Sequence, residues 1–97
     1  MELKRVVVTG LGALTPVGNN VAETWENLVK GISGAGPITH FDASKFKTHF
    51  ACEVKNFNGT DYIDRKELRK MGLYTQYAIA AAKEAVEDSG MDLEKED

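Results

Sequence analysis

The apolar positions near the N-terminus follow the pattern of a buried strand. Residues 5–9 (RVVVT) form a β-branched run that is closed by Gly10, which predicts a strand. Residues 10–18 contain three glycines and a proline, a composition typical of a loop.

The next segment has a helical period. Asn20 can cap a helix over residues 20–30, because Glu23 lies three positions later, as in a capping box. Gly31 is suited to end this helix in a left-handed conformation. The apolar stripe of the helix is formed by Val21, Trp25, Leu28, Val29 and Ile32.

The middle of the chain is less regular. Residues 33–46 contain glycine and proline and show little periodicity, so they are expected to form a loop. Residues 50–55 alternate weakly and predict a second strand. Thr60 or Asp61 can then cap a short basic helix that runs to about Met71.

The last element is an alanine-rich helix over residues 73–89, ended by Gly90. Its many alanines predict that neighbouring backbone approaches closely. One face is expected to hold Tyr74, Tyr77, Ala78, Ala81, Ala82, Ala85 and Val86.

These elements predict an α/β fold in the order strand, helix, strand, short basic helix and alanine-rich helix. The 97 residues have room for one small domain, and two strands do not make an independently stable sheet. The chain therefore resembles one edge of a larger α/β sheet.

Composition narrows the possible functions. A formal charge of −3 argues against a general nucleic-acid binder, and a single cysteine excludes an internal disulfide or a multi-cysteine zinc site. The first residues lack an apolar run suited to a signal peptide or a membrane span. We therefore expect a cytoplasmic protein with no nucleic-acid or membrane partner.

Four groups of residues are candidates for chemistry, and three of them are weak. Gly10 and Gly12 match half of a dinucleotide-binding motif, but the following helix starts too late to hold a pyrophosphate, so a tight turn is favoured. Cys52 lies in a predicted strand beside Glu53, without the helix N-terminus or adjacent histidine that activates a thiol, and is expected to be a half-buried structural residue. His40 and His49 (the latter three residues before Cys52) are too few for a metal site and are expected to be surface or loop-anchoring residues.

The fourth group is basic. Lys66, Arg69 and Lys70 occupy positions i, i+3 and i+4 and would share one face of the short helix. Such a face can dock an acidic protein or a phosphorylated ligand, although Asp64 and Glu67 could also make it an ordinary solvated face.

Taken in order, many pieces of the chain resemble the N-terminus of the type II β-ketoacyl-acyl-carrier-protein synthases, the elongating condensing enzymes. The resemblance is collinear up to about Leu93. Its main pieces are residues 5–19 (RVVVTGLGALTPVGN), Trp25, Leu28, residues 31–34 (GISG), His40 to Asp42, Phe46, Val54 and Lys55, Lys66, Arg69 to Met71, Gln76 and Tyr77, and Asp88 to Gly90.

The resemblance implies a thiolase-like layered fold, with residues 1–97 as an N-terminal fragment of its first half and no complete domain boundary. It implies transfer of an acyl group from acyl carrier protein to a cysteine, followed by decarboxylative Claisen condensation with malonyl-carrier protein in fatty acid elongation. The nucleophile and the two catalytic histidines of the family lie beyond residue 97, so this chain holds no catalytic residue and is expected to be inactive alone. The resemblance also implies no cofactor or metal, a homodimer, and contact of the carrier protein with Lys66, Arg69 and Lys70.

Two other functions stay open. The chain could be a non-catalytic module that binds carrier protein, or part of a relative that resembles a chain-length factor of polyketide synthesis. The sequence after residue 97 distinguishes all three functions. A cysteine at the nucleophile position followed by two histidines indicates an enzyme, a glutamine in its place indicates a partner subunit, and no downstream chain indicates a binding fragment.

Overall fold

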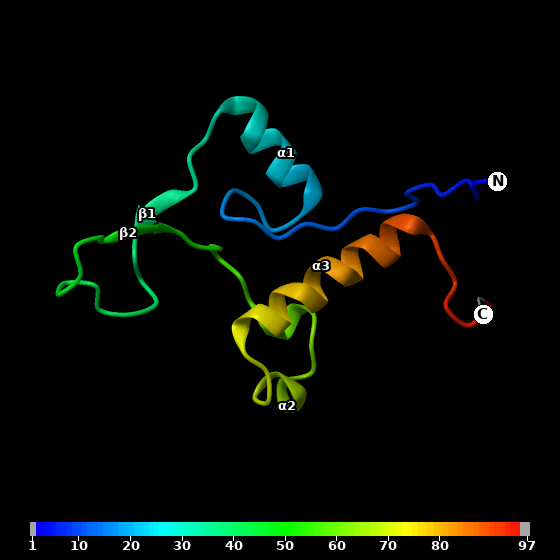
Figure 1. The fold of residues 1–97 in the computed structure, drawn as a ribbon. Coiled ribbons are helices and arrows are strands. Elements are labelled where there is room, and N and C mark those ends of the chain that lie inside the picture. The colour runs from blue at the N-terminus through cyan, green and yellow to red at the C-terminus, as the bar shows by residue number, and fades with distance from the viewer. Residues whose placement is uncertain (1, 96–97) are drawn as a thin grey trace.

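The computed structural model describes residues 2–95. Figure 1 shows an open arrangement in which a hairpin and a small helical unit lie apart from each other. Its elements in chain order are α1 (Val21–Lys30), β1 (Ala35–Pro37), β2 (Phe50–Cys52), the 3-10 turn η1 (Gly59–Asp61), α2 (Arg65–Leu68) and α3 (Leu73–Ser89).

Helix α1 has the ends that its sequence predicts. The Asn20 side chain accepts a hydrogen bond from the Glu23 N–H at 2.8 Å, and the Glu23 carboxylate accepts one from the Asn19 N–H at 3.2 Å. Gly31 follows in the left-handed region with φ 73°, which favours glycine. Helix α3 spans residues 73–89 as predicted.

The predicted strand over residues 5–9 is not formed in the described part of the chain. The side chains of Val6 and Val8 are 89% and 78% exposed. A strand needs a neighbour to pair with, and both assigned strands pair with each other in a separate hairpin. The β-branched run therefore lies uncovered.

The hairpin corrects two further expectations. β1 lies inside the predicted loop, and β2 ends at Cys52 rather than at residue 55. The two strands are antiparallel, with Ala35 opposite Cys52 and Pro37 opposite Phe50. The Ala-Gly-Pro sequence of β1 carries no strand pattern of its own, so its conformation depends on the pairing with β2.

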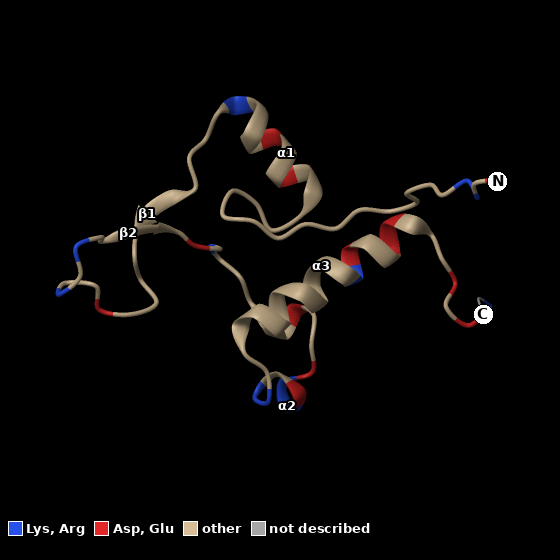
Figure 2. Cartoon of the chain, in the orientation of Figure 1, with Lys and Arg blue, Asp and Glu red and all other residues tan. Residues whose placement is uncertain are grey.

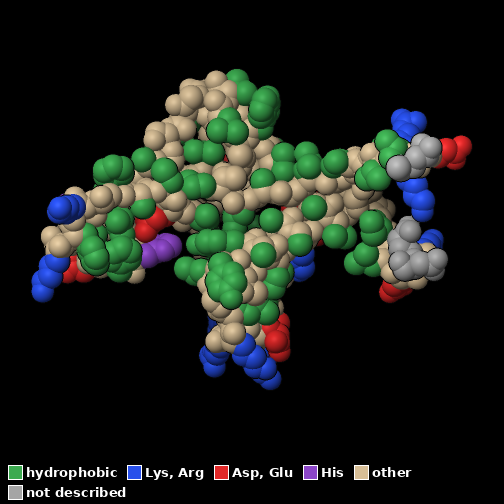
Figure 3. Space-filling model, viewed as in Figure 1, with side chains coloured by type: hydrophobic (Ala, Val, Ile, Leu, Met, Phe, Trp, Pro, Cys, Tyr) green, Lys and Arg blue, Asp and Glu red, His purple; other side chains and the backbone are tan. Residues whose placement is uncertain are grey.

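The described part of the chain encloses very little core. Within residues 2–95, the buried apolar residues are Ala43, Ile63 and Ala80. The Cα radius of gyration is 17.2 Å, against about 13 Å for a compact domain of this size. The accessible surface is 8117 Å², against roughly 5,500 Å² for a folded monomer of this mass. Apolar side chains accordingly cover much of the face in Figure 3.

Backbone does approach α3 closely, as its alanines predict. A Cβ at Gly12 would lie 1.8 Å from the Ala81 carbonyl oxygen, and one at Gly10 would lie 2.3 Å from the Ala85 carbonyl oxygen. The predicted apolar face is only partly covered, since Tyr74, Ala78 and Ala82 are exposed.

Candidate docking site

The basic residues lie on a protrusion at the start of α3, which we call the basic segment (residues 64–71). The predicted short basic helix is present but shorter than the expected span from Thr60 or Asp61 to Met71, because η1 occupies its first part and α2 has only four residues. Lys66 lies within α2, Arg69 is its C-terminal cap, and Lys70 follows. The chain then continues in 3-10 turns, with the Lys70 N–H bonded to the Glu67 carbonyl at 3.0 Å.

The three cations are exposed and lightly paired. Lys66, Arg69 and Lys70 are all solvent-exposed, and Figure 2 shows the blue positions gathered at α2 and the turn after it. The Lys70 ammonium lies 3.6 Å from the Glu67 carboxylate, with both side chains more than half exposed. Such a pair contributes little free energy. Within residues 2–95, Lys66 and Arg69 have no carboxylate within 4.0 Å, so their charge is available to a partner.

Packing beneath the basic segment holds it in place. Gly59 and Ile63 are buried next to it. A Cβ at Gly59 would lie 2.5 Å from Leu68 Cδ1 and 2.6 Å from Gln76 Oε1, so both side chains close over this glycine. The Gln76 Nε2 group donates a hydrogen bond to the Met71 carbonyl at 3.2 Å.

Aromatic contacts extend this packing into α3. The Phe57 ring stacks on Tyr62 with centroids 5.8 Å apart and meets Tyr77 edge-on at 5.0 Å. The Lys83 ammonium donates to the Tyr62 carbonyl at 2.7 Å. The basic segment therefore packs against one of the better-packed parts of the chain.

The glycine loop is unsuited to a dinucleotide. The Leu11 N–H donates to the Asp88 carboxylate at 3.0 Å, and the Ala13 N–H donates to Glu84 at 2.9 Å. Glu84 also accepts from the N–H of Val21, the first residue of α1, at 3.0 Å. Two carboxylates of α3 thus occupy the donors that a phosphate would need, and the glycines serve close packing rather than only a turn.

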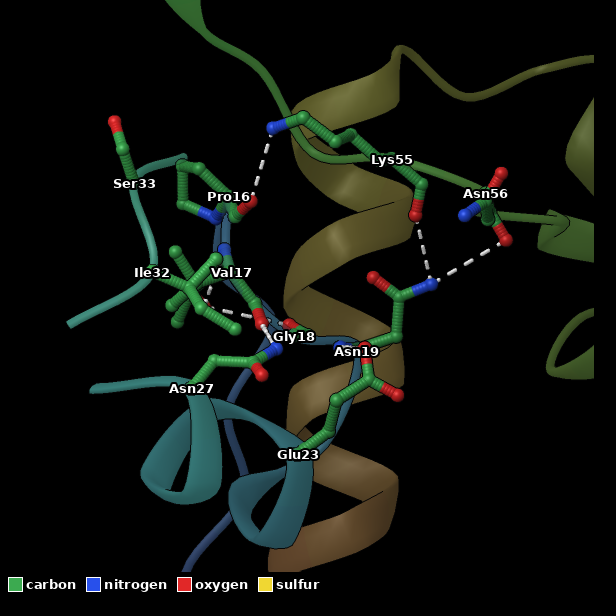
Figure 4. A pocket seen from close by; sticks show the side chains of 11 residues that line it. Pro16, Val17, Gly18, Asn19, Glu23, Asn27, Ile32, Ser33, Lys55 and Asn56 are labelled. Atoms are coloured by element: carbon green, nitrogen blue, oxygen red, sulfur yellow. Dashed lines mark hydrogen bonds between the residues drawn. The ribbon is translucent and has the colours of Figure 1, made fainter. Parts of the chain in front are cut away.

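A cavity of about 180 Å³ lies beside this loop (Figure 4). The Lys55 ammonium on its wall donates to the carbonyls of Pro16 at 3.0 Å, Gly34 at 2.7 Å and Glu53 at 2.9 Å. The Asn19 amide donates to the Lys55 carbonyl at 2.9 Å. These contacts join three segments of backbone, so the polar groups at this edge serve the fold and leave Lys55 without a donor for a ligand.

The remaining candidates show no catalytic arrangement. Cys52 is exposed, which corrects the expectation of a half-buried thiol, because within residues 2–95 β2 belongs to a sheet of only two strands. His49 Nε2 lies 2.6 Å from the Phe46 carbonyl, and His40 lies 3.8 Å from the Glu53 carboxylate. His49 thus anchors its loop and His40 is a surface residue, as predicted, and neither is hydrogen-bonded to Cys52 in the described residues.

Sequence reasoning missed four residues that organise this site and its surroundings. Gln76, Glu84 and Asp88 lie on α3, and Lys55 follows β2. The spacing of Glu84 and Asp88, four residues apart on one helix, was a usable signal. The partners of these carboxylates lie 71 and 77 residues away, so no local pattern shows them.

The geometry matches a known class of protein. The structure is similar to a chain of the ishigamide ketosynthase/chain length factor, with a TM-score of 0.83 and 42% sequence identity over 91% of this chain and 22% of that chain. The described fold is therefore the N-terminal part of a ketosynthase fold of the thiolase-like class, and the predicted α/β fold class is confirmed.

The family follows from the sequence comparison. The model of the β-ketoacyl synthase N-terminal domain matches residues 3–97, so the chain belongs to the β-ketoacyl synthase family. It is 54% identical over 90 residues to 3-oxoacyl-[acyl-carrier-protein] synthase 2 of Staphylococcus aureus (strain COL), covering 93% of this chain and 22% of that protein. It is 50% identical over 96 residues to the Vibrio harveyi protein of the same name, covering 99% of this chain and 23% of that protein. The chain thus spans less than a quarter of the length of these relatives.

Within residues 2–95, none of the helices combines the length and the apolar character that crossing a bilayer requires.

Proposed function

We propose that this chain is the N-terminal portion of a 3-oxoacyl-[acyl-carrier-protein] synthase and that its basic segment docks the acyl carrier protein. The whole enzyme would transfer an acyl group from the carrier to a cysteine and extend it by decarboxylative Claisen condensation with malonyl-carrier protein. The nucleophile and its histidines would lie outside these 97 residues. This chain would bind the carrier protein that delivers the substrate, and it would not itself make or break covalent bonds.

The observation that carries the docking proposal is the exposed basic segment with its packed base. Lys66, Arg69 and Lys70 project from one short protrusion, and two of them lack a carboxylate partner in the described residues. The relatives at 50% and 54% identity are named 3-oxoacyl-[acyl-carrier-protein] synthases. Because the family resemblance implies an acidic carrier protein, opposite charges would steer its encounter with the segment.

The test is a triple reversal, K66E/R69E/K70E, in the full-length protein. We expect kcat/KM for acyl-carrier protein to fall at least tenfold, while turnover of a small thioester without carrier barely changes. Single reversals should weaken carrier binding about two- to fivefold, because an exposed pair contributes about 0–1 kcal/mol.

The matched control is K4E/K45E/K47E, which changes the net charge equally at exposed lysines elsewhere. It should leave both substrates nearly unaffected. Equal loss with both substrates in the docking variant, or equal loss of carrier kinetics in the two triple variants, would show that the segment is an ordinary solvated face.

A second candidate is a partner subunit like a chain-length factor, since the structural neighbour is a ketosynthase/chain length factor. Sequencing the downstream nucleophile position separates the two, because a glutamine there would exclude the condensing activity. A cytoplasmic homodimer belongs to the main proposal, and sedimentation of the full-length protein with cell fractionation tests it.

A further inference from the structure

We propose that Gln76 is a positioning residue for carrier-protein docking, acting through the Met71 carbonyl on the backbone of the basic segment. This inference rests on the proposed function of that segment. It concerns how the cations are held rather than which partner they meet.

The basic segment needs an external anchor because its own helix is too short to be stable. α2 has four residues, and isolated helices shorter than about 12 residues are marginal in water. Asp64 makes no side-chain cap bond at its start. The end is closed by the Lys70 N–H to the Glu67 carbonyl and by the Met71 N–H to the Leu68 carbonyl, which are single-turn bonds.

Two contacts supply the anchor, one on each side of Arg69 and Lys70. Leu68 packs over Gly59 on the N-terminal side. On the C-terminal side, Gln76 Nε2 donates to the part-buried Met71 carbonyl at 3.2 Å. The backbone that carries the two cations is thus fixed at both ends.

Gln76 itself is rigidly placed. Its N–H donates to the Gly72 carbonyl at 3.2 Å, so it lies in the first turn of α3. Its Oε1 faces Gly59, where an added Cβ would come within 2.6 Å, and this leaves Nε2 toward Met71. The amide therefore joins α3 to the basic segment across the break at Gly72.

This arrangement has a kinetic consequence. Docked cations must be ordered, and any disorder of their backbone in the free enzyme must be removed on binding, which lowers affinity. Loss of the Gln76 bond should therefore raise KM for carrier protein and leave the chemistry unchanged.

The experiment uses Gln76→Met in the full-length protein, since methionine keeps the volume and removes the donor. Thr75→Val is the matched control in the same helical turn, because the Thr75 hydroxyl has no hydrogen-bond partner in the described residues. We expect Q76M to raise KM for acyl-carrier protein about three- to tenfold, with kcat for a small thioester unchanged. Amide hydrogen exchange over residues 69–71 should become faster in Q76M and stay the same in T75V.

A double-mutant cycle shows whether Gln76 acts through the cations. In an R69A/K70A background, Q76M should raise KM little further, because the ordered groups are gone. An unchanged KM in Q76M, or an equal rise in the R69A/K70A background, would overturn the inference. If Q76M does not fold, Q76L serves instead, since leucine is also uncharged and lacks the donor.

If the docking proposal is wrong, the measurements give a different result from the one expected when only the role of Gln76 is wrong. In that case R69A/K70A alone would leave carrier KM unchanged. The exchange measurement would then show only whether Gln76 orders the backbone of the basic segment. Faster exchange over 69–71 in Q76M would support that ordering without a docking role, and unchanged exchange would refute it.

Discussion

Gly12 shows how much of this fold depends on single residues where two segments touch. The loop that contains it runs against the backbone of α3, and a Cβ at this position would overlap the Ala81 carbonyl oxygen. Backbone cannot yield as a flexible side chain can. The absence of a side chain at Gly12 is therefore what permits the contact.

We predict that Gly12→Ala destabilises the full-length protein by about 3 kcal/mol, because overpacking against backbone forces the loop away from α3. The measurement is the midpoint of urea unfolding. Gly36→Ala is the control, since an added Cβ there meets no atom within 4 Å in the described chain. A G12A midpoint equal to that of G36A would contradict the close-packing account.

The sequence alone draws attention to Gly12, but it does not show why a glycine is needed there. The glycines at 10 and 12 predict a turn on local grounds, whereas their role comes from Ala81 and Ala85, far along the chain. The same holds for Gln76, whose bond to Met71 joins two elements that a periodic pattern treats separately. The cations were found because charge and spacing are local properties.

Some helices and strands are determined by residues close together in the sequence, and others by contacts with residues far along the chain. α1 and α3 appear as predicted, since their caps, periodicity and terminal glycines lie within a few residues. The strand over residues 5–9 and the loop over 33–46 were predicted wrongly, because strand pairing depends on partners elsewhere. The length of α2 was overestimated because Asp64, with φ −57° and ψ 137°, leaves the helical region between η1 and α2.

At the base of the hairpin loop, Glu53 accepts hydrogen bonds from Thr39 and His40, and we call this group of three residues the polar clasp. The Thr39 hydroxyl donates to the Glu53 carboxylate at 2.8 Å, and the N–H groups of Thr39 and His40 donate to it at 3.2 Å. The Thr39 hydroxyl bond, the largest cause, and these N–H groups hold the pKa of Glu53 below its ordinary value, although partial desolvation opposes them.

This shift predicts how the clasp depends on pH. Because the folded pKa of Glu53 is lower than its unfolded pKa, the stabilisation is fully present above the unfolded pKa. It is lost as the pH falls through the folded pKa. Carboxyl carbon NMR of the full-length protein should show Glu53 titrating below an ordinary glutamate, and Thr39→Val should move the midpoint upward.

Thr48→Val, in the same loop and without a hydrogen bond in the described residues, is the control and should leave the Glu53 midpoint unchanged. A Glu53 midpoint that does not respond to T39V would show that the hydroxyl contact is not formed in solution.

The whole molecule is more open than a self-sufficient domain. Its accessible surface exceeds that of a compact monomer of the same mass by roughly 2,600 Å². Trp25 and Val29 on α1 are 67% and 69% exposed, so even well-capped helices lack cover for their apolar faces. The family relation accounts for this, because the relatives are more than four times longer than the stretch they share with this chain.

We predict that the isolated 97 residues are marginally stable or self-associate, and that they do not condense acyl and malonyl groups. Exposed apolar faces drive association, and covalent catalysis needs a nucleophile with a paired base, which the described residues do not show. Sedimentation velocity across concentrations and a carrier-protein condensation assay provide the measurements. A monomer with a cooperative, concentration-independent melt would contradict the first part, and turnover abolished by Cys52→Ser would contradict the second.

The central claim is that the basic segment binds an acidic carrier protein by electrostatic attraction. The most direct measurement is the Kd of the full-length protein for acyl-carrier protein, determined at several salt concentrations for the wild type and for K66E/R69E/K70E. Exposed charges are screened over about 8 Å at physiological ionic strength, so the wild-type Kd should rise steeply with salt. The variant should bind at least tenfold more weakly at low salt and respond to salt much less. Equal Kd values, or parallel salt dependences for the two proteins, would contradict the account.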